Sequence, residues 1–370
     1  MLGAELGVRL QLWAGDTLPI PVPRDVVAAL QSVSVQSGGQ DGDGFQLTFR
    51  LARDGVLDYS LLDAMAPMKR VSLGVLFGAF PQPLAEGFIT DLQFTPSDQP
   101  GASTLTVSGR DLGARMDLEE RNESYRNQPD GVIALGVLAP YARYGVAPLA
   151  TQTANVPIET QRIPRQAETD LAFLRRIARR NGFVFYVEPV GFGAAAAYWG
   201  PENRAAELQP ALTVGMGPHG NVRGLHFSRD ALAPVGVEGS FIEPNTGITI
   251  PIPVLPSLKI PPLSAMPAPV YRTRVARDAA QRAAPDAALG MMAEMSNAPD
   301  ALRGQGELDA VRYGGVLKAR RLVGVRGAGF THDGPYYVES VSHSITVGSF
   351  TTSFSLKREG TGSLLPVLPV

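Results

Sequence analysis

Alternation of apolar and polar residues is the feature that most constrains this chain. Residues 45–51 read Phe-Gln-Leu-Thr-Phe-Arg-Leu, and successive side chains of an extended strand point to opposite faces. The alternation recurs in four later segments, 71–75, 88–94, 105–107 and 350–356. In the second of these segments, we expect Phe88, Leu92 and Phe94 to share one face. The pattern therefore predicts a mainly β fold of short antiparallel strands, arranged as a barrel or a sandwich.

Composition narrows the fold and the function further. The chain has 370 residues, 44% of them hydrophobic, which suits two or three packed domains, while its 40 glycines and 31 prolines disfavour long helices. Its net charge of -2 argues against a dedicated nucleic-acid-binding protein. The absence of cysteine excludes disulfides and thiolate metal sites, and it is consistent with folding in a reducing cytoplasm. We expect neither a signal peptide nor a membrane-spanning segment.

Two segments change to helical spacing. Residues 130–139 are expected to form a helix that Asp130 caps and Pro140 ends. A second helix follows Thr169, which is a good N-cap, and its last turns carry four arginines between 175 and 180, where the helix dipole favours cations. Asn181-Gly182 closes this helix, and 183–187 is predicted to be a buried strand. The sequence thus predicts a small α/β element between β regions.

The later part of the chain returns to strands. They are expected at 222–227, 235–242 and within 315–358. Between them, the proline-dense stretch 251–269 predicts an extended linker or arm. The alanine- and methionine-rich stretch 271–295 predicts a helix that is broken near Pro285.

Two parts of the chain also resemble each other. Lys69-Arg70-Val71 and the residues after it match Arg320-Arg321-Leu322, and 88–94 match 337–343. Each pair of segments precedes a further alternating strand, at 105–108 and at 354–357. Because order and spacing agree as well as composition, we predict an internal duplication, although two unrelated barrels remain the alternative.

Residues 168–185 resemble one known group of proteins. Glu168 is followed by Phe173-Leu174-Arg175-Arg176-Ile177-Ala178, then by Gly182 and an aromatic-rich strand. This order is similar to the phage late control D family, which includes the VgrG proteins of type VI secretion and the hub proteins of contractile injection systems. Two further segments carry the resemblance, 87–112 and 334–356.

The resemblance implies a structural hub without catalytic residues, cofactor or metal. It implies two tube-protein-like antiparallel β-barrels in one chain, and a homotrimer in which six similar barrels form a ring around a channel. The implied partners are the spike protein, the tail tube or tube-initiator protein and the baseplate wedge proteins, with DNA or cargo only in transit. The implied location is the baseplate of a virion or injection particle assembled in the bacterial cytoplasm, without membrane insertion. Because a VgrG-like β-helix is missing after the second barrel, we expect a separate spike.

The expected division has four parts. Residues 1–115 are assigned to the first barrel, 116–215 to the α/β insertion, 216–360 to the second barrel with an insertion at about 251–305, and 361–370 to an apolar tail. Exposed apolar segments mark partner sites, so the tail supplies the candidate partner interface, Leu364, Leu365, Val367 and Leu368. A disordered chain end is the alternative for these residues.

Other motifs favour structural interpretations. The glycine-rich segment 215–220 is followed by a strand and contains Pro218, so a dinucleotide-binding loop is disfavoured. The four histidines lack metal-site spacing, and the arginines at 175–180 are read as helix-dipole and solubility residues rather than a DNA contact.

Two rival functions remain. The acidic cluster of Asp117, Glu119, Glu120 and Glu123 has arginines interleaved with it, which indicates a solvated surface. A tail-associated cell-wall hydrolase would use a carboxylate pair such as Glu119 with Glu123. A carbohydrate-binding β module would instead need exposed aromatic platforms, and the chain has only two tryptophans.

Overall fold

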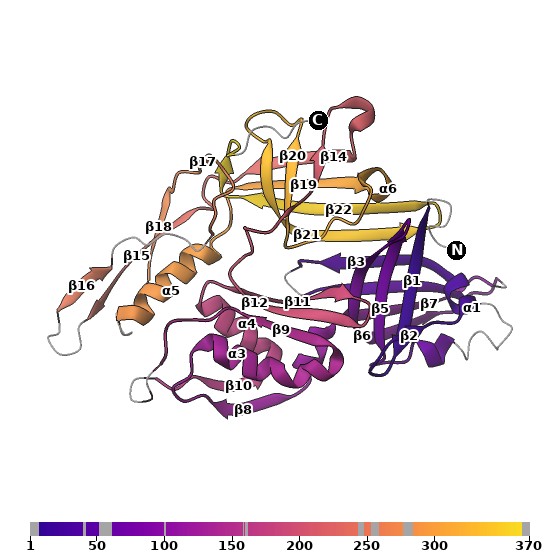
Figure 1. Ribbon diagram of the computed structural model, residues 1–370, viewed down its shortest axis with the longest axis horizontal. Coiled ribbons are helices and arrows are strands. Elements are labelled where there is room, and N and C mark those ends of the chain that lie inside the picture. The colour runs from indigo at the N-terminus through magenta and orange to yellow at the C-terminus, as the bar shows by residue number, and fades with distance from the viewer. Residues whose placement is uncertain are drawn as a thin grey trace.

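The structure is a computed structural model that describes residues 7–39, 42–51, 61–99, 101–157, 159, 162–242, 248–252, 259–276 and 284–364. Figure 1 shows two β regions side by side, with an α/β module below them and an arm projecting beside it. The mainly β fold class predicted from the alternation, with large antiparallel sheets and a small α/β insertion, is confirmed.

The first β region, called the N-half sheet, contains six long strands in the order β3-β4-β7-β6-β5-β1, with the two-residue strand β2 paired to β1 at its edge. Their bounds are β1 Val8–Gly15, β3 Leu30–Ser37, β4 Gly44–Leu51, β5 Arg70–Phe77, β6 Phe80–Thr95 and β7 Ser103–Asp111. The short elements β2 (Ile20–Pro21) and α1 (Arg24–Ala28) lie between β1 and β3. On β4, Phe45, Leu47 and Phe49 are buried, as the alternation predicts.

The second β region, the C-half sheet, contains six strands in the order β14-β19-β22-β21-β20-β13. Their bounds are β13 Leu208–Thr213, β14 Val222–Arg229, β19 Leu302–Asp309, β20 Leu322–Arg326, β21 Gly334–Thr346 and β22 Ser349–Arg358. Helix α6 (Ala310–Tyr313) follows β19. Because β13 already pairs with β20, the second β region begins before residue 216, the boundary expected from the sequence.

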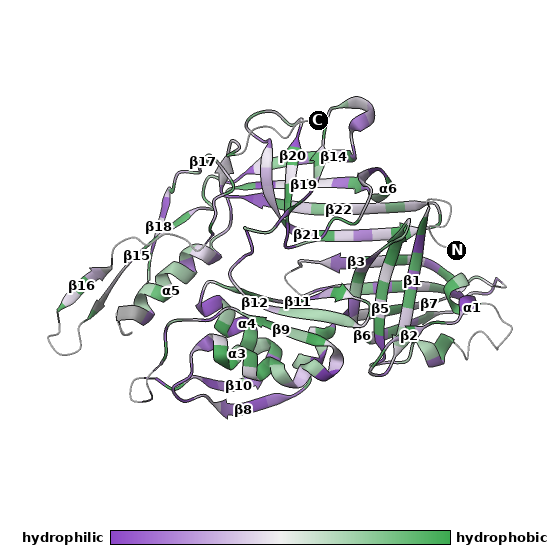
Figure 2. Ribbon diagram, viewed as in Figure 1, coloured by the Kyte–Doolittle hydropathy of each residue, from purple (hydrophilic) through white to green (hydrophobic). Residues whose placement is uncertain are grey.

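The α/β module lies between the two halves in sequence. Its elements are η2 Leu112–Asp117, β8 Glu120–Ser124, α3 Asp130–Leu138, η3 Ala139–Tyr144, β9 Val146–Ala150, β10 Arg165–Thr169, α4 Asp170–Arg180, β11 Val184–Gly191 and β12 Ala194–Gly200. In Figure 2, the hydrophilic strands β8 and β10 lie together along the lower side of the module, beneath its more apolar helices and strands. Its core holds Phe173 and Trp199, both fully buried. The helix predicted after Thr169 is confirmed, because the Thr169 hydroxyl accepts a hydrogen bond from the Ala172 amide at 3.3 Å.

The arm is inserted between β14 and β19. It consists of β15 Val235–Ile242, β16 Thr249–Ile252, β18 Arg272–Val275 and α5 Ala284–Asn297, and the proline-dense stretch contributes β17 Met266–Pro267, which pairs with β23 Gly360–Thr361. Of the helix expected within 271–295, α5 is described from Ala284 onwards, whereas Arg272–Val275 form β18 instead. The insertion also begins at β15, earlier than residue 251.

The two half-sheets have the same strand order. Strands β1, β3, β4, β5, β6 and β7 take the places that β13, β14, β19, β20, β21 and β22 take in the other half. The β6–β7 ladder and the β21–β22 ladder also contain a β-bulge at the same place. Thr90 is the extra residue of a bulge in β6, and Glu339 is the extra residue at the matching place in β21. Gln31 in β3 and Arg223 in β14 form a second matched pair of bulges.

A matched backbone turn also supports the duplication. Met68 and Arg320 have positive φ values of 62° and 60°, which non-glycine residues seldom adopt. Their amides donate to the Ile89 and Val338 carbonyls, both at 2.8 Å. One difference remains, since β1 pairs antiparallel with β5 but β13 pairs parallel with β20.

The matched features correct the sequence alignment. They place Met68, not Lys69, opposite Arg320, and they place Val107, not Leu105, opposite Phe354. The alignment of 88–94 with 337–343 agrees with the strand pairing. Short strands of similar pattern allow shifts of one or two residues, which only long-range pairing resolves.

The expectation that Phe88, Leu92 and Phe94 share one face is wrong. The bulge at Thr90 inserts one residue between them and reverses the side to which the following residues point. Phe88 therefore packs in the core of the α/β module, while Ile89 and Leu92 face the core of the half-sheets. Phe94 stays 57% exposed.

Candidate functional site

The two half-sheets are joined by a ladder between β21 and β3, which we call the strand joint. Val341 to Thr346 pair antiparallel with Ser37 to Ser32, so one continuous sheet runs through both halves. The side chains of Val341, His343 and Ile345 are buried there. Both halves contribute to a single apolar core, in which the rings of Phe77 and Phe350 lie 5.9 Å apart. The two expected barrels are therefore fused along one edge.

An ion pair fastens the strand joint beside this ladder. The Arg320 guanidinium donates to both carboxylate oxygens of Asp43, at 2.6 and 2.8 Å. The side chains are only 11% and 9% exposed. The Asp43 carboxylate also accepts from the Gly38 amide, and Gly38 lies so close to the Glu339 carbonyl that a Cβ would meet it at 2.1 Å. The ion pair between Arg320 and Asp43 thus depends on the bulge at Glu339 and on glycine at position 38.

Electrostatics at the strand joint follow from this burial. The pKa of Asp111 is raised to about 6, because burial penalises its charge and the neighbouring Asp43 carboxylate repels it. Full burial lowers the pKa of His343 to about 4, and its Nδ1 lies 2.9 Å from the Thr352 hydroxyl. Neutral His343 is therefore the form that the joint accommodates at neutral pH.

The α/β module is attached at the same place. The Arg320 guanidinium lies 4.3 Å from the centre of the Tyr186 ring on β11. Its neighbour Arg321 donates to Glu188 at 2.6 Å. The adjacent arginines, which the sequence marked only as part of a repeat, thus hold together the N-half sheet, the C-half sheet and the module.

A buried ion network fixes the base of the arm. Arg204, fully buried, donates to Glu202, Asp300 and Glu359 at 3.3, 3.3 and 2.8 Å. The Lys259 ammonium lies 3.1 Å from Asp300. Burial alone would raise the pKa of Asp300, but Lys259 and Arg204 outweigh it and lower that pKa. Sequence reasoning missed this network because its members come from distant segments.

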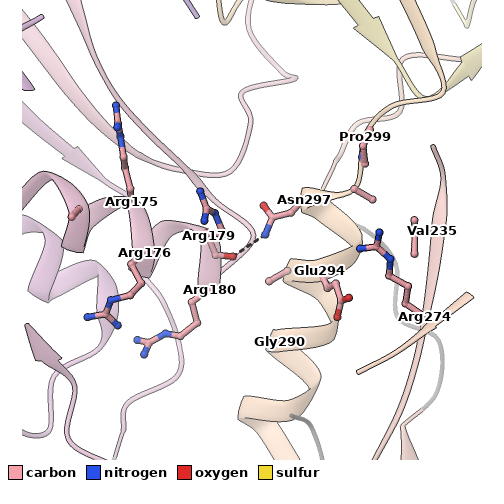
Figure 3. Close-up of a pocket in the computed structure, with 13 residues that line it drawn as sticks. Arg175, Arg176, Arg179, Arg180, Val235, Arg274, Gly290, Glu294, Asn297 and Pro299 are labelled. Atoms are coloured by element: carbon pink, nitrogen blue, oxygen red, sulfur yellow. Dashed lines mark hydrogen bonds between the residues drawn. The ribbon is translucent and has the colours of Figure 1, made fainter. Parts of the chain in front are cut away.

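The arginines of α4 line a cleft of about 710 Å³ between α4 and the arm, whose helix α5 forms part of the wall, as shown in Figure 3. Arg175, Arg176, Arg179 and Arg180 lie along α4, and Arg274 of β18 lines the same cleft from the other side of α5. Arg176 and Arg180 are engaged in ion pairs with Glu168 and Asp130 inside the α/β module. These two contacts agree with the structural interpretation of the arginines. A guanidinium-lined cleft also suits carboxylate or phosphate groups.

Two strand segments are equivalent to the two partners of the strand joint. In the described part of the chain, each of them has one edge that pairs with no strand. In β6, residues 91–95 pair with β7 on one edge only. Strand β14 likewise pairs only with β19. Their equivalents β21 and β3 each pair on both edges. We call these two segments the open edges.

The other residues singled out in the sequence do not converge on a catalytic site. Asp117, Glu119, Glu120 and Glu123 are exposed, and Asp117 accepts a hydrogen bond from the Thr169 hydroxyl at 2.8 Å. The glycine-rich segment 215–220 forms a loop with a short 3-10 turn before β14. Trp199 is buried, and Trp13 stacks on Phe192 with ring centres 5.4 Å apart, so neither tryptophan forms an open platform.

The candidate partner interface at the chain end is described only in part. Leu364 is 53% exposed, whereas Leu365, Val367 and Leu368 lie outside the described residues. Within the described ranges, no cluster of His, Cys, Asp or Glu suited to a metal ion is present. None of the described helices combines the length and apolar character needed to cross a membrane.

Solved structures of known proteins share the fold. No protein-family model matches the chain, and no curated protein matches its sequence. The tail protein from Neisseria meningitidis MC58 is 15% identical, with a TM-score of 0.62 over 96% of this chain and 98% of that chain. The 43 kDa tail protein of prophage MuSo2 from Shewanella oneidensis is 16% identical, with a TM-score of 0.60 over 95% and 98% of the two chains.

A third similar structure is the E. coli c3393 protein, a component of the type VI secretion system with structural similarity to the T4 bacteriophage tail proteins gp27 and gp5. It is 12% identical, with a TM-score of 0.55 over 92% of this chain and 77% of that chain. Identities this low establish a common fold and nothing finer. Over nearly its whole length, the chain has the fold of these phage tail and type VI secretion proteins.

Proposed function

We propose that this chain is a non-enzymatic baseplate hub of a contractile phage tail or contractile injection system. It acts as a homotrimer with pseudo-sixfold symmetry that joins the tail tube to the central spike and lines the channel between them. The likeness of fold to tail proteins over 95% or more of the chain supports this function. So does the sequence resemblance to the late control D family.

The observation that carries the proposal is the duplicated strand order. Each chain contains two half-sheets of the same pattern, so three chains contain six equivalent half-sheets. Closed rotational symmetry is the usual arrangement of homo-oligomers. Such a ring matches a sixfold tube on one side. The arm, present once per chain, gives the other side threefold order.

The mass and symmetry of the purified protein test this proposal. Light scattering is expected to give three times the chain mass of 39.3 kDa, and electron microscopy is expected to show a threefold ring with a central channel. Co-sedimentation with a tail tube protein should follow. A protein that stays monomeric in the presence of its tube and spike partners contradicts the hub function.

Two further experiments address the finer parts of the proposal. Removal of residues 363–370 is expected to weaken spike binding or trimerisation, because the apolar tail is proposed to dock on the spike or on neighbouring subunits. Unchanged spike affinity together with unchanged trimerisation would remove that role. Zymography on peptidoglycan is expected to show no lytic band, and a band that Glu119→Gln abolishes would support the hydrolase instead.

A further inference from the structure

The cleft between α4 and α5 in Figure 3, which we call the arm cleft, is formed by one stripe of each helix. Residues three, four and seven positions apart share a face of a helix. The α4 stripe includes Arg175, Arg176 and Arg179, and the α5 stripe includes Gly290, Ala293 and Asn297. The Asn297 amide donates a hydrogen bond to the Arg179 carbonyl at 2.9 Å, so the two helices meet at one end of their stripes. Guanidinium groups thus line one wall of the cleft, and mainly small or neutral residues line the other.

Most of the guanidinium groups in the arm cleft have no counter-ion. Two of the five, on Arg176 and Arg180, are held by carboxylates of the α/β module. The other three form no ion pair or hydrogen bond with any residue that the structure describes, and they belong to Arg175, Arg179 and Arg274. Among the described lining residues, the one carboxylate is that of Glu294. The cleft therefore keeps an excess of positive charge, although the whole chain has a net charge of -2.

The walls of the arm cleft indicate which anion it suits. A guanidinium group binds a carboxylate through two parallel hydrogen bonds, and the volume of about 710 Å³ admits several side chains of a bound segment. Ala172 and Ala293 add small apolar surfaces beside the guanidinium groups. A nucleic-acid strand carries a negative charge on every nucleotide, so it would bring phosphates close to the Glu294 carboxylate. A protein segment with spaced carboxylates and small apolar side chains matches both the charges and the alanines.

We propose that the arm cleft is a docking site for an acidic segment of a partner protein, in which Asp or Glu side chains alternate with small apolar ones. Its carboxylates pair with Arg175, Arg179 and Arg274, and its apolar side chains lie against the alanines. In the proposed hub, a ring of three chains presents three such clefts, one beside each arm, to three equivalent segments of the partner. Only this number of sites rests on the proposed function, because the chemistry of the cleft belongs to the single chain.

Fluorescence polarisation on the full chain tests the site with a labelled peptide of repeated Glu-Glu-Ala-Leu units. We expect saturable binding that weakens as the salt concentration rises, because salt screens accessible charges. The variant Arg179→Glu/Arg274→Glu reverses two exposed, unpaired cations of the cleft and should lower the affinity at least about tenfold. The matched control Arg303→Glu/Arg312→Glu makes the same change of net charge at exposed residues of β19 and α6, outside the cleft, and should bind like the natural protein.

Two further probes determine the class of ligand. The same peptide with Gln in place of Glu should bind far more weakly, and a thymidine oligonucleotide of similar length should bind more weakly than the acidic peptide. Tighter binding of the oligonucleotide, lost in Arg179→Glu/Arg274→Glu, would overturn the acidic segment in favour of nucleic acid. An equal loss of peptide affinity in the control variant would reveal attraction to the charge of the whole chain and would also overturn the docking site.

The outcomes separate this inference from the proposed function. A threefold ring that fails to bind the acidic peptide overturns the docking site and leaves the hub intact. Binding of the peptide at the arm cleft by a protein that never forms a ring supports the docking site and contradicts the hub. Circular dichroism spectra of both double variants should match that of the natural protein, because each replaced arginine is exposed.

Discussion

The guanidinium of Arg320 donates to both carboxylate oxygens of Asp43, a residue 277 positions earlier in the chain. Arg320 comes from the turn before β20, and Asp43 directly precedes β4, so the pair spans the two half-sheets. In the duplicated pattern, Met68 and Leu302 hold these two places. The duplicated positions therefore carry apolar residues in place of this charged pair.

Replacing only Arg320 is expected to destabilise the protein strongly. Arg320→Met leaves the Asp43 carboxylate buried without its cation, which costs about 3–5 kcal/mol of the free energy of unfolding. The double variant Arg320→Met/Asp43→Leu copies Met68 and Leu302 and should recover part of this loss. Urea denaturation measures both. Equal stability of the single and double variants would mean that the ion pair is not what fastens the joint.

The stability of the protein should fall in mild acid because of His343. Its pKa is about 4 in the folded chain and 6.5 without burial, so the folded state resists the protonation that the unfolded state accepts. Above pH 6.5, His343 does not lower the free energy of unfolding. As the pH falls towards 4, that free energy decreases, and the loss reaches about 2 kcal/mol by pH 5.

The variant His343→Gln keeps a partner for Thr352 but does not titrate. The difference in unfolding free energy between the natural protein and this variant should therefore shrink or reverse as the pH falls from 7.5 to 5. Comparing the two proteins cancels the opposite effect of Asp111, whose raised pKa favours the folded state in acid. Parallel pH curves would contradict the assignment.

The ion network at the base of the arm should matter more than any surface pair. Arg204→Met leaves Asp300 buried with one cation fewer, and we expect a loss of about 3–5 kcal/mol in unfolding free energy. The matched control is Arg223→Met, whose side chain is 52% exposed and pairs with Glu307 and Asp309. That change should cost only about 0–1 kcal/mol. Similar thermal shifts for both variants would argue against a special role of the network.

The N-cap of α4 offers a smaller and local test. Thr169→Ala removes the oxygen that accepts from the Ala172 amide and should cost about 1 kcal/mol. Thr169→Ser retains that oxygen and should behave like the natural protein. Thermal unfolding of the three proteins measures the difference, and an unaffected alanine variant would mean that the cap adds no stability.

The sequence allowed the local elements to be predicted because their causes are local. Thr169 and the arginines of 175–180 mark both ends of α4, and the alternation of 45–51 marks β4 and its buried face. Fusion of the two half-sheets could not be predicted, because the pairing of Val341 with Ser37 depends on residues far apart and of ordinary strand type.

Features with no periodic signal were missed for the same reason. One inserted residue, Thr90, reversed the facing of Phe94, and no composition rule marks such a bulge. No periodic pattern marks Arg204 in the sequence, and only the fold brings Asp300 and Glu359 to it. Of the candidate interface at the chain end, only Leu364 lies within the described residues, so that assignment stays a prediction.

The sequence separation across the strand joint has a consequence for synthesis. Ser37 can pair with Val341 only after Val341 has been synthesised. At about 5–20 residues per second, the ribosome needs roughly 15–60 seconds to proceed from Ser37 to Val341. During that time the nascent chain carries β3 as an unsatisfied edge, open to premature pairing with another polysome-bound copy. Folding of this protein is thus completed only when its last strands emerge, and nascent intermediates, rather than finished chains, carry the greatest risk of aggregation.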